Sequence, residues 1–195
     1  MSFSIQGLDD LERSYRKAAA LMARAEVRAV RRSGVSVVAQ QARAIAQVVN
    51  LKVSTIKKSI RTVQQPSADQ PRVTFEVRGE GIALREFGAR QTGKGVSVLV
   101  LRASGRKIVA DAFMARGYGN NLQVFRRTGG AKRVMKAGRY TGKLREPIEK
   151  LYGPDVLSQY VKDAIQQAGA DAWNTRLPIE LEHECDRALS EAGLI

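Results

Sequence analysis

The chain has 195 residues and a formal net charge of +14, and 44% of its residues are hydrophobic although only 6% are aromatic. This length predicts one domain, whose core would consist mainly of aliphatic side chains. The single cysteine, Cys185, excludes an internal disulfide, and no apolar run approaches the roughly 20 residues of a membrane span, so we expect a protein kept in a cytoplasm, or in a particle assembled there.

The positive charge is unevenly distributed along the chain. The net charge is +4 over residues 1–50, +15 over residues 51–150 and −5 over residues 151–195. A basic body can bind the phosphates of nucleic acid. Alternatively, the acidic end of one copy can face the basic surface of the next, or the charge can simply keep the surface solvated. The charge pattern leaves these three interpretations open.

A long helix is predicted for the first quarter of the chain. Ser2–Gln6 alternates polar and apolar residues and could form a short edge strand. From residue 8 to about Val49, apolar residues recur at three- and four-residue steps, which predicts one long or two nearly continuous amphipathic helices. Ser33-Gly34 marks a bend or a place where another backbone comes close, and Asn50 is the expected end of the helix.

Short elements are predicted next. We expect Ser54 to cap a short helix from Thr55 to about Arg61. Gln64–Pro71 is polar and bracketed by prolines, which predicts a loop. Arg72–Arg78 alternates cleanly and predicts a half-buried strand, whereas Ile82–Phe87 fits a helical turn or a short strand.

The middle of the chain predicts a small antiparallel sheet. The further strand candidates are Val96–Leu101, Ile108–Ala110 and Leu122–Arg126. Polar and basic residues dominate the segments between them. We therefore expect the strands to be joined by long basic connections.

A second helix is predicted for the C-terminal segment. Pro154, beside Asp155, fits the first helical position, where a missing amide proton is tolerated. An apolar stripe from Val156 to Ala172 continues the helix. Pro178 should end or kink it, after which residues 179–192 form an acidic second half.

The segment between Asp111 and Glu146 contains many cations and glycines but no carboxylate. It has few apolar residues and no internal counter-charge, so it cannot bury itself and must lie in water or meet an anionic partner. The candidate residues for contact with DNA or another partner are Arg126, Arg127, Lys132, Arg133, Lys136, Arg139, Lys143 and Arg145.

Motifs for catalysis or cofactor binding are incomplete. Gly88–Lys94 fits the start of a phosphate-binding loop, but Gly95 replaces the hydroxyl that would hold Mg²⁺, and strand-like sequence follows where a helix should begin. The only histidine, His183, lies next to Glu184 and near Cys185, yet adjacent residues do not share a helix face. We therefore expect no metal site, no cofactor, no catalytic residue and no enzyme activity.

Four short sequence blocks follow one another along the chain. They are Arg85–Val98, Gly105–Lys107 followed by Ala112-Phe113, Val124–Arg127 and Arg145–Pro154. Their order and spacing resemble the minor tail protein Z family, the tail completion proteins of lambda-like long-tailed phages and their prophages. The resemblance covers most of the chain.

The resemblance implies a structural virion protein that finishes the head-proximal end of a tail, so that the tail can join a DNA-filled head. Tail tubes of such phages are hexameric, so it implies a six-fold ring that contacts the tail terminator or tube, with head–tail connector proteins as further partners. The basic segment would line the channel, grip the double-stranded DNA end or face a protein. The alternative function is a non-specific DNA- or RNA-binding protein, associated with the nucleoid or the ribosome.

These predictions amount to an α+β fold. A long N-terminal helical segment and a C-terminal helix would pack on a small antiparallel sheet with long basic loops. We expect one tail-completion domain over residues 1–195, made of a helical arm (1–62), a basic sheet with loops (70–150) and an acidic C-terminal helical segment (153–195). Its partners would be its own copies, other tail or neck proteins and DNA, and no membrane.

Overall fold

The computed structural model of the protein describes residues 8–117, 120–136 and 141–194. Contacts within the chain divide it into two compact units. A helical unit contains the described residues up to 42 together with 60–77 and those from 161 onward, and a sheet unit contains residues 43–59 and 78–160. The predicted α+β class is confirmed, because long helices and small antiparallel sheets occur together. The single domain over residues 1–195 stays a prediction.

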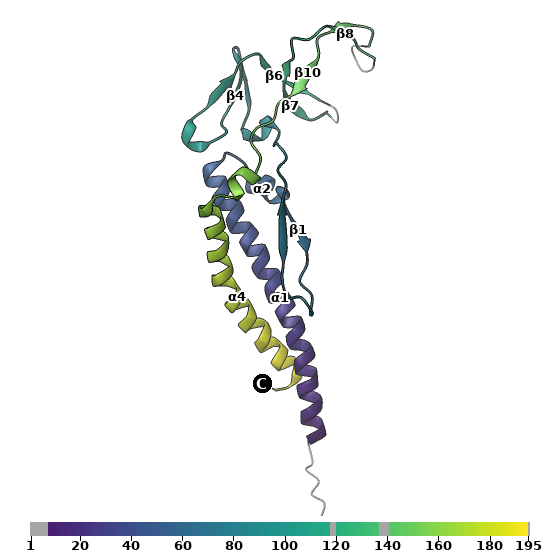
Figure 1. Ribbon diagram of the computed structural model, residues 1–195, viewed down its shortest axis with the longest axis vertical. Helices are drawn as coiled ribbons and strands as arrows, with labels where there is room; N and C mark the ends of the chain where they lie inside the picture. The colour runs from purple at the N-terminus through teal and green to yellow at the C-terminus, as the bar shows by residue number, and fades with distance from the viewer. Residues whose placement is uncertain (1–7, 118–119, 137–140, 195) are drawn as a thin grey trace, which may run out of the picture. The chain divides into compact units, whose positions relative to one another are not determined.

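The helical unit is organised around α1 (Leu8–Val48), which continues beyond it into the sheet unit. Figure 1 shows α4 (Asp163–Ala192) along one side of α1, and the hairpin of β1 (Ile60–Gln64) and β2 (Thr74–Val77) along the other. Small residues make up most of the buried positions of the two helices. These buried residues include Ala18, Ala25, Ala29 and Ala42 of α1 and Ala188 and Ala192 of α4.

The helix α1 confirms the long predicted helix and runs without interruption through Ser33-Gly34. A Cβ atom added to Gly34 would lie 2.9 Å from Cγ1 of Val73 and 3.1 Å from Cζ of Phe75. Of the two expectations for this site, the bend is therefore wrong, and the close approach is made by side chains of the β2 region. The predicted strand Ser2–Gln6 lies outside the described residues.

The sheet unit contains three small sheets in its described part. One has the order β3-β4-β5, another the order β10-β7-β6, and the third is the pair β8-β9, all with antiparallel neighbours. The bounds are β3 (Arg90–Thr92), β4 (Gly95–Val98), β5 (Lys107–Val109), β6 (Ala112–Arg116), β7 (Leu122–Arg127), β8 (Arg133–Val134), β9 (Leu144–Arg145) and β10 (Ile148–Lys150). These short strands form several small sheets where one was expected.

Short helices complete the sheet unit. They are α2 (Val53–Ser59), η1 (Leu84–Phe87), η2 (Arg102–Ser104) and α3 (Leu157–Tyr160). Phe87 in η1 is fully buried together with Ile56 of α2 and Val96 of β4, and these side chains form the core of the unit. The helical turn predicted for Ile82–Phe87 is thus confirmed as η1.

Two predicted helix starts are wrong. Ser54 lies inside α2, which begins at Val53 and ends before residues 60–64 form β1. Pro154 precedes α3 by more than one residue, and Asp155 has the capping role, because its Oδ1 accepts a hydrogen bond of 3.0 Å from the Ser158 amide. The two helices α3 and α4 are separate, so the predicted stripe from Val156 to Ala172 is broken.

The helix α4 does not end at Pro178 but continues to Ala192, and Figure 1 shows that it curves. Proline removes one amide donor from the helix, and the packing of both flanking halves against α1 compensates for that loss.

No helix in the described part of the chain has an apolar stretch that could cross a membrane.

Candidate interaction surfaces

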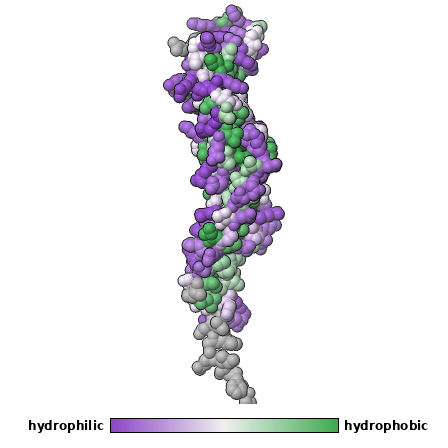
Figure 2. Space-filling model, turned by 90° about the vertical axis from the view of Figure 1, so that its left-hand side faces the viewer, coloured by the Kyte–Doolittle hydropathy of each residue, from purple (hydrophilic) through white to green (hydrophobic). Residues whose placement is uncertain are grey.

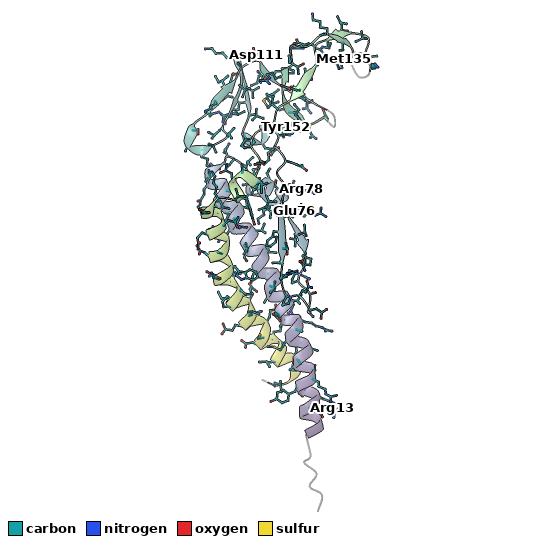
Figure 3. All side chains as sticks on the ribbon, viewed as in Figure 1. Arg13, Glu76, Arg78, Asp111, Met135 and Tyr152 are labelled. Atoms are coloured by element: carbon teal, nitrogen blue, oxygen red, sulfur yellow. The ribbon has the colours of Figure 1, made fainter. Side chains whose placement is uncertain are left out.

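The predicted basic segment contains a hairpin, described over residues 128–136 and 141–146, which we call the basic hairpin. At its base, the Thr128 amide donates to the carbonyl oxygen of Pro147 at 3.1 Å. Further out, β8 pairs with β9 and with no other strand that the structure describes, and the Met135 amide donates to the carbonyl oxygen of Lys143 at 3.0 Å. Figure 3 labels Met135 on this hairpin, where the neighbouring side chains project outward.

Most of the predicted contact residues lie on the basic hairpin. Arg145 is half-buried on β9, and Arg139 lies outside the described residues. The exposed cations of the described part of the hairpin are Lys132, Arg133, Lys136 and Lys143. The hairpin therefore brings four of the predicted cations together at the surface. Arg126 and Arg127 lie on β7, which precedes the hairpin in the sequence.

Arg126 and Arg127 have counter-charges within the chain, from Glu149 and Glu146, which lie at or beyond the end of the acid-free segment. β10 pairs with β7 in a register that places Glu149 opposite Arg126, and Nη2 of Arg126 lies 2.7 Å from Oε1 of Glu149. Arg127 lies 4.0 Å from a carboxylate oxygen of Glu146, and its guanidinium is 5.7 Å from the centroid of the Phe113 ring. Both arginines stay about half exposed, so these pairs are weak and do not remove the positive field.

The basic hairpin has two different faces. Cross-strand partners share a face and successive residues alternate, so Val134 and Leu144 lie on one face and Arg133 and Arg145 on the other. Val134 is 56% exposed and Leu144 60%, and the adjacent Met135 is 38% exposed. Exposed aliphatic side chains gain nothing from burial, so the face with Val134 and Leu144 favours contact with a partner.

A second acid-free surface was missed in the sequence. Asp111 is the only carboxylate between Glu86 and Glu146, so the strands β3, β4 and β5 lie in a further acid-free run, residues 87–110. Arg90, Lys94 and Lys107 are exposed there. The sequence contained evidence for this surface, because Asp111 is the single acid in residues 87–145.

Arg106 holds a fixed position on this second surface. Its Nη2 donates to the carbonyl oxygens of Gly88 at 2.6 Å and Ser97 at 2.9 Å, and its Nε donates to Oγ of Ser97 at 2.9 Å. All three acceptors are neutral, so the guanidinium keeps its full charge while its orientation is set. A fixed, uncompensated cation is suited to an anionic partner.

The acidic half of α4 divides its charges between two faces. Glu180 and Glu184 face α1, where Nη1 of Arg32 lies 2.7 Å from Oε1 of Glu184 and 3.5 Å from Oε2 of Glu180. Glu182 and Asp186 are exposed and have no hydrogen bond or ion pair within the described residues. Part of the acidic charge expected to serve assembly therefore serves the packing of α4 on α1.

Glu184 is fully buried and also accepts a hydrogen bond from Nε of Arg28. Burial alone would raise the pKa of Glu184. The hydrogen bond from Arg28 and the positive charges of Arg28, Arg32 and Arg187 outweigh it, so the pKa lies below the ordinary value of 4.5. The carboxylate is therefore ionised and structural.

The motifs that resemble chemical sites have structural positions. Gly88 ends η1 with φ of 65°. Three residues of the phosphate-loop-like segment form β3 (Arg90–Thr92), and Gly93 and Lys94 form the turn into β4, so no helix N-terminus follows the segment. Within the described ranges, no group of three or more His, Cys, Asp and Glu side chains could hold a metal ion. On the face that Figure 2 shows, hydrophobic side chains lie in patches among predominantly hydrophilic ones.

A comparison with protein families gives one match. The family model described as prophage minor tail protein Z (GPZ) matches residues 4–191. The matched residues include both units and the basic hairpin. No curated protein and no solved structure matches the chain.

Proposed function

The chain belongs to the prophage minor tail protein Z family, and from this premise we propose that it completes the head-proximal end of a phage tail and joins the tail to the head. As a member of the family it is a structural protein of the tail. We expect it to act as a ring of copies, by six-fold symmetry with the tail tube, that contacts the tail terminator or tube and the connector proteins of the head. A non-specific contact with the end of the double-stranded DNA is part of this proposal.

The observation that carries the proposal is the basic hairpin with its acid-free surroundings. Four exposed cations lie on a two-stranded ribbon that packs on no other strand in the described residues. A ribbon of this kind contributes little to its own stability. Its charge is best explained by a partner, which in a tail that joins a DNA-filled head is a neighbouring protein or the phosphates of the DNA.

We assign the contact with DNA to more residues than the eight that the sequence predicted. The eight predicted residues remain candidates for an anionic partner, and Arg90, Lys94, Arg106 and Lys107 on the β3-β4-β5 sheet join them. Non-specific contacts of this kind bring counterion release, so DNA affinity should fall with salt by a logarithmic slope of about 0.9 for each phosphate contacted. Loss of one contact should reduce that slope by about one.

Reversal of the charge on the basic hairpin tests the proposal in assembling particles. Lys132, Arg133, Lys136 and Lys143 are replaced together by Glu, and head-joined particles that retain DNA are counted by electron microscopy and infectivity. We expect tails to be made but joined particles to fall by at least tenfold, because each reversal introduces repulsion toward the anionic partner.

A matched control separates this effect from a general loss of positive charge. Lys52, Lys57, Arg72 and Arg78 are exposed and lie outside the acid-free stretch, so their reversal to Glu changes the net charge by the same amount. Near-normal joining in the control and failure in the hairpin variant support the proposal. Normal joining and DNA retention in the hairpin variant would show that the hairpin is only a solvated surface.

A further inference from the structure

One face of the sheet β10-β7-β6 gathers aromatic side chains. The register places Phe113 of β6 opposite Phe125 of β7, and Phe125 opposite Lys150 of β10. Directly opposed residues share a face, and the centroids of the two phenyl rings are 6.1 Å apart. Tyr152, two residues after Lys150, lies on the same side, because the Lys150 ammonium is 4.9 Å from the centroid of its ring. We call the three rings and the cations beside them the aromatic face.

The aromatic face is turned away from the core of the sheet unit. The buried side chains of these strands, Ala112 and Val124, alternate with Phe113 and Phe125 and therefore lie on the opposite face. Phe113 and Phe125 are half-buried, whereas Tyr152, labelled in Figure 3, is 57% exposed. The three aromatic side chains therefore keep surface that a ligand can cover.

Cations accompany the rings on this face. The guanidinium of Arg127 lies 5.7 Å from the centroid of the Phe113 ring, and Lys150 has no ion pair within the described residues. Glu149 is the one carboxylate of the three strands, and it lies on the opposite face, where it is paired. Glu146 approaches Arg127 only to 4.0 Å. The aromatic face is therefore positively charged.

Rings and cations in this arrangement suit nucleotides that are not base-paired. Aromatic side chains on a sheet can stack on the faces of bases while adjacent cations bind the phosphates. Bases in a duplex are stacked on each other about 3.4 Å apart and leave no face free. The two phenyl centroids are 6.1 Å apart, so each ring would take a base that is separated from its neighbour. A purely apolar protein surface would leave both cations without an anion.

We propose that the aromatic face binds single-stranded DNA, with bases stacked on Phe113, Phe125 and Tyr152 and phosphates paired with Arg127 and Lys150. The inference rests on the DNA contact of the proposed function and names the form of DNA that is bound. Unpaired nucleotides occur where a duplex ends or opens. The aromatic face would therefore hold the end of the DNA, while the cations of the acid-free surfaces hold the duplex.

Removal of the bases tests the stacking on the purified full-length chain. Fluorescence anisotropy measures the binding of a labelled oligothymidylate of about 10 nucleotides, of an abasic strand with the same number of phosphates and of a duplex of the same length. We expect the wild type to bind the oligothymidylate about tenfold or more tightly than the abasic strand, because only the oligothymidylate can stack. Since both strands carry the same charge, equal affinities would overturn the inference.

Replacement of the rings by aliphatic side chains isolates their contribution. Phe125→Leu and Tyr152→Leu should each weaken binding of the oligothymidylate by between about fivefold and about a hundredfold, the loss of one stacked base. Binding of the abasic strand and of the duplex should stay unchanged. Thermal unfolding checks that each variant is folded, and the exposed Tyr152 keeps the test decisive if Phe125→Leu is unstable.

Two variants outside the sheet are the matched controls. Phe75 is half-buried on β2, and Tyr15 is 60% exposed on α1. Phe75→Leu and Tyr15→Leu remove the same groups as the variants of the aromatic face, and both should bind the oligothymidylate like the wild type.

The outcomes distinguish this inference from the proposed function. If the duplex is bound but the ring variants bind the oligothymidylate normally, the stacking is wrong while the DNA contact stands. If the ring variants keep this binding but lose association with other tail proteins, the aromatic face serves a protein instead. A wild-type chain that binds neither strand nor duplex would overturn both the inference and the DNA contact, whereas the joining of tail and head is tested separately by the reversal of the hairpin charges.

Discussion

Glu184 is the buried carboxylate through which α4 is held on α1. Its side chain is fully buried, whereas Arg28 keeps 31% and Arg32 47% of its side chain exposed. Burying a carboxylate alone would be strongly unfavourable, so the two arginines are required wherever this acid is present. The sequence showed an acidic segment but gave no means of telling this inward acid from the outward ones, because their environment depends on the partner helix.

Replacement of Glu184 by Gln should reveal this dependence. The amide keeps the shape of the side chain but leaves Arg28 and Arg32 without their anion. We expect a loss of about 2–3 kcal/mol, less than the roughly 3–5 kcal/mol of a fully buried pair, because Arg28 remains partly in water. Chemical denaturation measures the change, and the exposed Glu182→Gln on the same helix should stay within about 0.5 kcal/mol of the wild type.

The stabilisation lost in Glu184→Gln should depend on pH. The pKa of Glu184 is lower in the folded than in the unfolded state, so the carboxylate contributes its full stability above the ordinary value of 4.5 and loses it as the pH falls through the lower folded pKa. The difference in unfolding free energy between wild type and Glu184→Gln should therefore shrink below pH 4.5. A difference that stays constant down to strongly acid pH would show that the charge of Glu184 does not stabilise the fold.

At the scale of elements, the long periodic segments and the strands β2, β4, β5 and β7 were predictable, and several other strands were not. The stripe from Leu8 to Val48 needs no partner to be recognised as a helix, and the alternation around Phe75 identified β2. The strands β6, β8, β9 and β10 have two to five residues and exist only because another strand lies beside them. For the same reason the pairing of Arg126 with Glu149 could not be foreseen, since it depends on the register of β10 against β7.

The hairpin of β3 and β4 offers a clean test of one element. Gly95 is buried with φ of 136°, and a Cβ atom there would overlap the carbonyl oxygen of Val109 on β5. Gly95→Ala should cost about 2–4 kcal/mol, because backbone strain adds to a clash that no side chain can relieve. Gly93, two residues earlier, has no atom within 4 Å of an added Cβ, so Gly93→Ala in the same unfolding measurement is the control. Equal stability of the two variants would contradict the described packing of β4 against β5.

At the scale of the whole molecule, the fold separates the charges that pair within the chain from those that remain exposed. The basic α1 and the acidic α4 neutralise part of each other's charge within one chain through Arg28, Arg32, Glu180 and Glu184. The surplus remains on the basic hairpin, on the β3-β4-β5 sheet and on the outward face of α4. Sequence alone located the basic segment, but the division between internal and available charge required the fold.

The accessibility of the hairpin lysines in finished particles tests most directly whether this surplus charge serves contact with another macromolecule. Lys132, Lys136 and Lys143 would be acetylated with a small reagent in the purified chain and in assembled particles, with Lys57 of α2 as reference, and the modified fraction read by mass spectrometry. We expect the three hairpin lysines to lose reactivity severalfold on assembly relative to Lys57, because bound ammonium groups are covered and paired. Hairpin lysines that react equally in free chain and finished particle would contradict the account.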